Sequence, residues 1–216
     1  MAAGDILTIM HDNAGNRARI EAKTREILSS PAVPILLGGD DSVVSPFLAG
    51  FADHGPVWIL QIDAHIDWRD EVHGERYGYS SPMRRASEMA HVAGMVQVGL
   101  RSVGSARLTE IEAARHYGSR FVTAREVHAL GVEAALRHIP EGARVVVTFA
   151  ATVSTQASCL ASPHVRPAAS PIRRSSISSQ ASASGRGSPV SILWSSIRQT
   201  TLTACRRSPP RAFSSM

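Results

Sequence analysis

Three side chains of metal-binding types lie at alternating positions in one short stretch of the sequence. Asp63, His65 and Asp67 follow the apolar run at residues 56–60. Side chains two residues apart point the same way in an extended chain, so this spacing predicts that the three groups converge just beyond a buried strand. Two carboxylates and an imidazole suit a divalent cation such as Mn²⁺. The same residues also fit a polar loop with a capped helix behind it, because short motifs recur by chance.

A second apolar run, at residues 33–37, also ends in an acidic loop, which contains Asp40 and Asp41. Strand and helix patterns alternate throughout residues 1–150. The expected strands are 33–37, 57–62, 95–100 and 144–149, and the expected helices are 16–29, 43–52, 81–91, 106–116 and 123–136. This alternation predicts an α/β fold of three layers, in which helices cover both faces of a parallel sheet. Ligands bind beyond the carboxyl ends of the strands in such sheets, which is where both acidic stretches lie.

Two motifs and a third segment resemble the ureohydrolases, the arginase and agmatinase family, and are most similar to the bacterial agmatinases. The motifs are GGDDS at residues 38–42 and DAHID at 63–67, and GYSSPMRRASEM follows at 78–89. The resemblance implies an arginase-like fold and hydrolysis of a guanidino group to urea and an amine, with two Mn²⁺ ions that activate the attacking water. It covers roughly residues 12–149 and implies that the amino-terminal region is shortened.

The resemblance also implies roles for particular side chains. The implied metal ligands all lie in the two motifs and are Asp41, Asp63, His65 and Asp67, of which Asp63 and His65 are also the implied catalytic groups. Asp41 stands where many family members have a histidine, and Asp40 is expected to orient its loop. The implied substrate contacts are Ser80, Ser81 and His73. The alternative for the serines is a capped helix start with solvated arginines, and the alternative for His73 is simple exposure to solvent.

Charge is unevenly distributed along the chain, whose net charge is +5. Residues 1–150 hold 15 basic and 18 acidic side chains, whereas residues 151–216 hold eight arginines, 17 serines and no acidic residue. We therefore expect a partial ureohydrolase domain over residues 1–149 and a disordered Ser/Arg/Pro-rich tail over residues 150–216. The excess of basic over acidic charge is confined to the tail, so a nucleic-acid partner is not expected for the domain.

A single deleted base accounts for the change at the tail. Family members follow the strand equivalent to residues 145–149 with DCDGLDPS, which supplies further metal ligands. One coding of FDCDGLDPS, with the A of its first aspartate codon deleted, translates as FAATVSTQA, the sequence of residues 149–157. Later tail segments are compatible with other family phrases in the same shifted frame. Ala150 and Thr152 then replace two metal carboxylates, so we expect weak metal binding and impaired or absent turnover.

Two classes of function follow from these observations. The first is an agmatinase-like, Mn²⁺-dependent hydrolase, with agmatine as the favoured small-molecule substrate and guanidinobutyrate next. The second is a non-enzyme, either an inactive frameshifted product or a protein that binds acidic partners through its basic tail. No apolar run approaches the ~20 residues of a membrane span, so a cytoplasmic protein without a membrane partner is expected. The family resemblance implies a homotrimer or hexamer.

Overall fold

The computed structural model describes residues 2–101, 106–150, 190–195 and 201–206. Eight strands in these ranges form one sheet. The strands are β1 (Ala2–Asp5), β2 (Ala32–Leu37), β3 (Val57–Ile62), β4 (Val92–Leu100), β5 (Arg120–Thr123), β6 (Val145–Ala150), β7 (Val190–Ser195) and β8 (Thr201–Arg206). The helices are α1 (Asn13–Leu28), α2 (Val44–Ala49), α3 (Pro82–Ala86), α4 (Leu108–Tyr117), α5 (Ala124–Leu130) and α6 (Glu133–Leu136), with 3₁₀ turns η1 (Asp41–Val43) and η2 (Ala52–His54).

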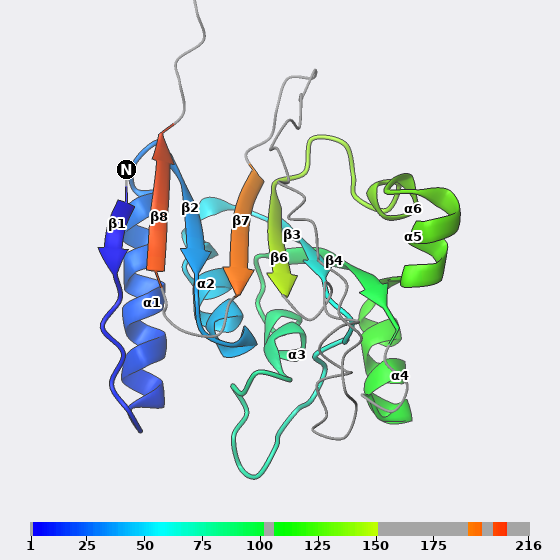
Figure 1. The fold of residues 1–216 in the computed structure, drawn as a ribbon, viewed down its shortest axis with the longest axis horizontal. Helices are drawn as coiled ribbons and strands as arrows, with labels where there is room; N and C mark the ends of the chain where they lie inside the picture. The colour runs from blue at the N-terminus through cyan, green and yellow to red at the C-terminus, as the bar shows by residue number, and fades with distance from the viewer. Residues whose placement is uncertain (1, 102–105, 151–189, 196–200, 207–216) are drawn as a thin grey trace, which may run out of the picture.

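The sheet is parallel except at one edge. Its strand order is β1-β8-β2-β7-β6-β3-β4-β5, and β8 runs antiparallel to both of its neighbours. The arrowheads of β2, β7 and β6 point to the same edge of the sheet, and that of β8 points the opposite way (Figure 1). Loops that follow parallel strands therefore gather at one edge, where side chains from separate parts of the chain can meet.

Side chains that alternate along the central strands build a core on each face of the sheet. On β3, Ile59 belongs to the cluster that contains Phe47 of α2 and Ala114 of α4. Its neighbour Leu60 packs against the second cluster, which contains Ala134 of α6. Successive strand residues face opposite sides, so α1 to α4 cover one face and α5 and α6 the other. The predicted three-layer α/β fold is confirmed.

The start of one helix was predicted correctly from the sequence, whereas the ends of two helices differ from the prediction. The capping box predicted at Thr123 is confirmed, because its Oγ1 accepts a hydrogen bond from the backbone N–H of Glu126 at 3.2 Å. The helix expected to continue to residue 136 is interrupted at Gly131, whose φ of +72° ends α5. The helix expected over residues 81–91 ends at Ala86. Beyond it the backbone N–H of Glu88 donates to the Arg85 carbonyl, three residues back, at 3.2 Å, and the Ser87 hydroxyl donates to the Arg84 carbonyl at 2.7 Å. Among the described helices, none is long and apolar enough to cross a membrane.

Two segments of the tail, residues 190–195 and 201–206, form strands β7 and β8. β7 lies between β2 and β6 and is parallel to both, and β8 pairs with β2 along its length. The sequence of β7, VSILWS, is a short apolar run with β-branched residues, which favours a strand inside a sheet. Residues 151–189, 196–200 and 207–216 lie outside the described residues.

Candidate metal centre and its cavity

The chain turns sharply where β3 ends. The backbone N–H of Asp63 donates to the Val98 carbonyl at 2.9 Å, and its Oδ1 accepts from the backbone N–H of His65 at 3.0 Å. Asp67 then adopts a left-handed backbone with φ of +48°. Aspartate side chains that bond to the backbone two residues on produce such turns. Asp63 and Asp67 therefore converge through a turn and not through the strand-like alternation that the spacing predicted.

Three of the four predicted metal ligands lie together. Oxygen atoms of Asp41, Asp63 and Asp67 are all within 4.8 Å of one another. Asp41 begins η1 beyond β2, whereas the other two follow β3. Asp63 and Asp67 are 1 % and 8 % exposed, and Asp41 is half-buried. The candidate centre thus joins two loops at the carboxyl edge of the sheet.

The electrostatics of this cluster favour a cation. Burial raises the pKa of Asp67 well above its ordinary range, and the neighbouring Asp63 and Asp41 carboxylates raise it further. Buried like charges disfavour the ionised form of a carboxyl group, and a dication among them reverses that balance. Oxygen ligands in a buried pocket are the donors that Mn²⁺ accepts. The residues present therefore fit a divalent ion.

His65 lies beside the three carboxylates. Its Nδ1 is 3.1 Å from Oδ1 of Asp63, and its side chain is 39 % exposed. The hydrogen bond to Asp63 raises the pKa of the imidazole, against a smaller lowering by burial. His65 lines the same cavity as Asp41 and Asp67. Its role as a fourth ligand stays a prediction.

A cavity of about 630 Å³ opens over the cluster. Of the predicted substrate contacts, His73 and Ser80 line it, whereas Ser81 is fully buried at the start of α3 and does not. Ser81 is too deeply buried for the predicted contact with substrate. The hydroxyl of Ser81 also makes no capping hydrogen bond, so the expected cap is absent at that residue.

Four charged residues that were not predicted from the sequence also line this cavity. They are Arg69, Glu71, Arg107 and Glu110. Arg69 Nη1 lies 3.2 Å from Oε1 of Glu110, which joins the loop after β3 to the first turn of α4. Arg69 and Glu71 directly follow the DAHID motif, and this proximity was a usable signal. Glu110 lies far from the motif in sequence, and its position becomes evident only from the fold.

The arginines of α3 hold the loop that carries these residues. Arg85 is 2 % exposed and pairs with Asp70, as well as with Glu88 at 3.2 Å. Arg84 Nε lies 3.5 Å from Glu88. The expectation of solvated arginines at this helix is therefore wrong for Arg85, since α3 packs against the loop and encloses its guanidinium.

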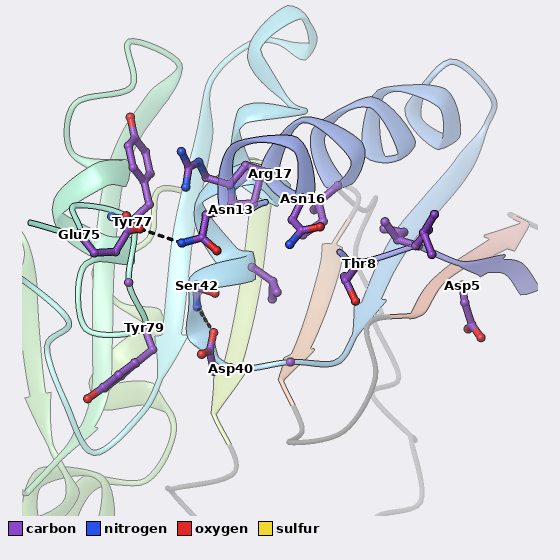
Figure 2. Close-up of a pocket in the computed structure, with 17 residues that line it drawn as sticks. Asp5, Thr8, Asn13, Asn16, Arg17, Asp40, Ser42, Glu75, Tyr77 and Tyr79 are labelled. Carbon is purple, nitrogen blue, oxygen red and sulfur yellow. Dashed lines mark hydrogen bonds between the residues drawn. The ribbon is translucent and has the colours of Figure 1, made fainter. Parts of the chain in front are cut away.

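A second cavity, of about 640 Å³, adjoins the first at Tyr79, which lines both. Figure 2 shows its walls, including the hydrogen bond from Asn13 Nδ2 to Glu75 at 3.1 Å. The Arg17 guanidinium lies 4.3 Å from the centre of the Tyr77 ring. Helix α1 therefore anchors the loop that carries His73 and Ser80.

Asp40 faces this second cavity and not the metal cluster. Its Oδ1 accepts a hydrogen bond from the backbone N–H of Ser42 at 2.9 Å, and it is the residue that precedes η1 (Figure 2). A side chain that caps a turn in this way fixes the backbone that follows it. This contact agrees with the expectation that Asp40 orients its loop, and it sets the position of Asp41.

Fold and site together define an α/β protein with a candidate divalent-metal centre at the carboxyl edge of its sheet. The chain belongs to the arginase family, whose family model matches residues 1–155. The match begins at residue 1, earlier than the expected start near residue 12, and ends soon after β6.

Individual relatives are similar over part of their length. The chain is 34 % identical over 101 residues to the mitochondrial agmatinase of Gallus gallus, covering 45 % of this chain and 30 % of that protein. It is 31 % identical over 136 residues to the guanidinobutyrase of Pseudomonas aeruginosa, covering 60 % and 42 %. The solved structure of proclavaminate amidino hydrolase from Streptomyces clavuligerus superposes with a TM-score of 0.60 at 27 % identity, covering 68 % of this chain and 50 % of that one. The chain therefore spans half or less of each of these proteins.

Proposed function

We propose that this site holds Mn²⁺ and hydrolyses a guanidino group to urea and an amine. The observation that carries the proposal is the meeting of the Asp41, Asp63 and Asp67 carboxylates beneath a cavity at the carboxyl edge of the sheet. A bound divalent metal supplies Lewis-acid chemistry and lowers the pKa of water. Membership of the arginase family makes the guanidino group the expected reacting group.

The residues of this chain have separate parts in that chemistry. The three aspartates would hold the metal, and the hydrogen bond that Oδ1 of Asp63 accepts from Nδ1 of His65 fixes the orientation of the imidazole ring next to it. Of the further acidic groups in the cavity wall, Glu71 is exposed and Glu110 is paired with Arg69. Cationic substrates suit a wall that contains several carboxylates.

Charge favours agmatine over guanidinobutyrate as the substrate. Agmatine carries a positive group at each end, whereas guanidinobutyrate carries a carboxylate at the end remote from its guanidinium. Asp41, Asp67, Glu71 and Glu110 line the cavity, against two arginines, Arg69 and Arg107. Both arginines already lie against Glu110, Arg69 at 3.2 Å and Arg107 at 3.9 Å, so the charge of each is partly balanced before a substrate carboxylate arrives.

A urea-release assay on the purified full chain with Mn²⁺ tests this function. Agmatine, guanidinobutyrate and arginine are compared, with Asp63→Asn as the inactive variant and Asp53→Asn as the control, because the Asp53 side chain is 77 % exposed and pairs with Arg25. The expected result is slow, Mn²⁺-dependent urea release that is fastest with agmatine, lost in Asp63→Asn and unchanged in Asp53→Asn. No urea from any of the three substrates would favour the non-enzyme alternative.

A second candidate function, an inactive frameshifted product, has its own support. Ala150 ends β6, where the frameshift interpretation places a lost carboxylate, and the family match stops at residue 155. Thr152, the position of the other lost carboxylate, lies outside the described residues. Resequencing the genomic DNA across the codons for residues 148–152 tests this proposal. A base missing from the recorded sequence would restore a full hydrolase, and a confirmed deletion would establish a decayed gene copy.

Assembly and tail binding are separate proposals. The homotrimer or hexamer implied by the family would appear as a mass three or six times that of the chain in solution. Binding of the basic tail to acidic partners would appear as a shift of nucleic acid in a gel that disappears as salt rises. A monomer without such a shift contradicts both.

A further inference from the structure

A continuous chain of buried hydrogen bonds leads from the interior of the sheet to the metal cluster. The Ser119 hydroxyl donates to Oε1 of Gln97 at 2.7 Å. Nε2 of Gln97 donates to Oε1 of Gln61 at 2.6 Å, and Nε2 of Gln61 donates to Oδ2 of Asp67 at 2.7 Å. The exposed fractions of these four residues are 6 %, 0 %, 3 % and 8 % in that order. Water therefore has little access to any link in the chain.

One backbone carbonyl determines the direction of the whole chain. Nε2 of Gln97 also donates to the carbonyl of Ile66 at 2.7 Å. A carbonyl only accepts hydrogen bonds, so the amide nitrogen of Gln97 must face Ile66 and its oxygen must face Ser119. Gln61 must then present its oxygen to Gln97 and its nitrogen to Asp67. The Asp67 carboxylate therefore accepts a hydrogen bond from the side-chain amide N–H of Gln61.

The chain connects a rigid part of the fold to a sharply turned loop. Gln61 and Gln97 lie on neighbouring parallel strands, β3 and β4, and are paired directly in register. Ser119 stands between α4 and β5. The loop after β3 is held at two points, the Ile66 carbonyl and the Asp67 carboxylate. The first contact is made by the residue before Asp67, and the second by Asp67 itself, whose φ is +48°.

We propose that the chain from Ser119 through Gln97 and Gln61 fixes the orientation of the Asp67 carboxylate and so prepares it to hold the metal. The proposal rests on the proposed function for its metal. Asp41 and Asp63 repel an ionised Asp67, and a donor on Oδ2 opposes the rotation of that carboxylate away from them. Partners behind a metal ligand change metal affinity by roughly 10–100-fold when they are removed. These three residues are positioning residues, because none belongs to the carboxylate cluster or lines the cavity above it.

The test measures the Mn²⁺ dissociation constant of the full chain by electron paramagnetic resonance. Gln61→Leu is expected to weaken binding by more than about tenfold, and Ser119→Ala, which removes only the remote hydroxyl, by about three- to tenfold. Ser119→Thr keeps the hydroxyl and is expected to restore affinity. The matched control is Thr148→Val, since Thr148 is 4 % exposed, pairs in register with Gln61, and its hydroxyl makes no hydrogen bond among the described residues.

Equal affinity in Gln61→Leu, Ser119→Ala and the parent chain would overturn the inference and leave the proposed function intact. Absence of Mn²⁺ binding by the parent would instead refute the proposed metal centre. In that case the side-chain amide signal of Gln61 in ¹⁵N-labelled protein decides the inference. The signal is expected to shift in Ser119→Ala but not in Thr148→Val, although Ser119 does not bond to Gln61 directly. An unchanged signal contradicts the proposed chain.

Discussion

Ala150 of β6 and Asp63 after β3 are the residues that follow the last paired positions of these two strands. The strands pair Gln61 with Thr148 and Ile62 with Phe149, so that the next positions are Asp63 and Ala150. Both side chains are buried, at 1 % and 5 % exposure. β6 therefore ends with a methyl side chain one position beyond its last pair with β3, where the other strand continues into Asp63. The contribution of β6 to the centre is apolar.

Replacing Ala150 by aspartate should strengthen Mn²⁺ binding. The new carboxylate would lie at the edge of the acidic cluster and add an oxygen ligand, and a gain of about tenfold in affinity corresponds to about 1.4 kcal/mol. Ala150→Asn is the matched control, because it has the same size without the charge. Calorimetric titration of the two variants measures the difference. Equal affinities would show that Ala150 does not face the metal.

The stabilising effect of Mn²⁺ should grow as the pH rises. The pKa of Asp67 is raised, mainly by burial, so the contribution of this carboxyl group to the stability of the metal-free fold is fully present below the ordinary value of 3.8 and is lost as the pH rises through the raised pKa. Mn²⁺ competes with the proton for the Asp67 carboxylate, so bound metal offsets the loss of stability at higher pH. Thermal unfolding with and without Mn²⁺ at about pH 5.5 and pH 8 should show the larger rise in Tm at the higher pH. An equal rise at both pH values, or the same trend in Asp67→Asn, would contradict this account.

The pair between Asp70 and Arg85 should stabilise the fold, because the guanidinium is 2 % exposed. Asp70→Ala leaves that charge with Glu88 alone and is expected to lower the free energy of unfolding by about 1–3 kcal/mol. Asp53→Ala removes an exposed partner of Arg25, which is itself 39 % exposed, and is expected to change it by less than about 1 kcal/mol. Urea unfolding at pH 7 compares the two variants. Similar losses from both would mean that the burial of Arg85 has no energetic consequence.

The pair between Asp70 and Arg85 also predicts how the stability of the fold decreases at acid pH. The hydrogen bond from Arg85 is the main reason that the pKa of Asp70 is lowered from 3.8. The pair therefore contributes stability above that value, and the contribution is lost as the pH falls through the lowered pKa. The parent chain should lose more stability than Asp70→Ala between about pH 5 and pH 2. If the parent chain and Asp70→Ala lost stability equally over this pH range, the pair between Asp70 and Arg85 would not contribute to stability as predicted.

The contact between α1 and α2 leaves no room for a side chain at Gly50. A Cβ at this position would lie 2.6 Å from Cβ of Thr24, which is fully buried, and 3.2 Å from the Phe47 carbonyl. Gly50→Ala is expected to lower the free energy of unfolding by about 1–3 kcal/mol, because neither neighbour can move freely. Gly78→Ala is the control, since its Cβ would meet only Cγ of Glu75 at an ordinary 3.7 Å. A neutral Gly50→Ala would show that the two helices separate easily.

Periodicity and local signals predicted many of the helices and strands, because residues close together in the sequence determine where such elements form. The strand expected over residues 57–62 has the observed bounds of β3, and the capping box at Thr123 forms as expected. The strand pairing of the tail was missed, because short apolar runs such as that of β7 carry no sign of their distant partners. The helix predicted over residues 81–91 was too long, because after Ala86 the chain forms turns with hydrogen bonds three residues back, which the apolar pattern does not reveal.

The candidate site was predicted in its composition but not in its geometry. Asp41, Asp63 and Asp67 meet as expected, although a turn at Asp67 and not strand alternation brings the last two together. Gln61 and Gln97 each interrupt an apolar strand, and such isolated polar residues are a signal of a buried network. Which groups they bond to depends on the register of β3 with β4, which sequence periodicity alone does not determine.

Calorimetric titration of Mn²⁺ into the full chain tests most directly whether the acidic cluster is a metal centre. The parent chain is expected to bind Mn²⁺, Asp63→Asn to lose more than about tenfold in affinity, and the surface variant Asp53→Asn to match the parent. This pattern would place the metal at the Asp41, Asp63 and Asp67 cluster. Absence of binding by the parent, or equal binding by Asp63→Asn, would contradict the account.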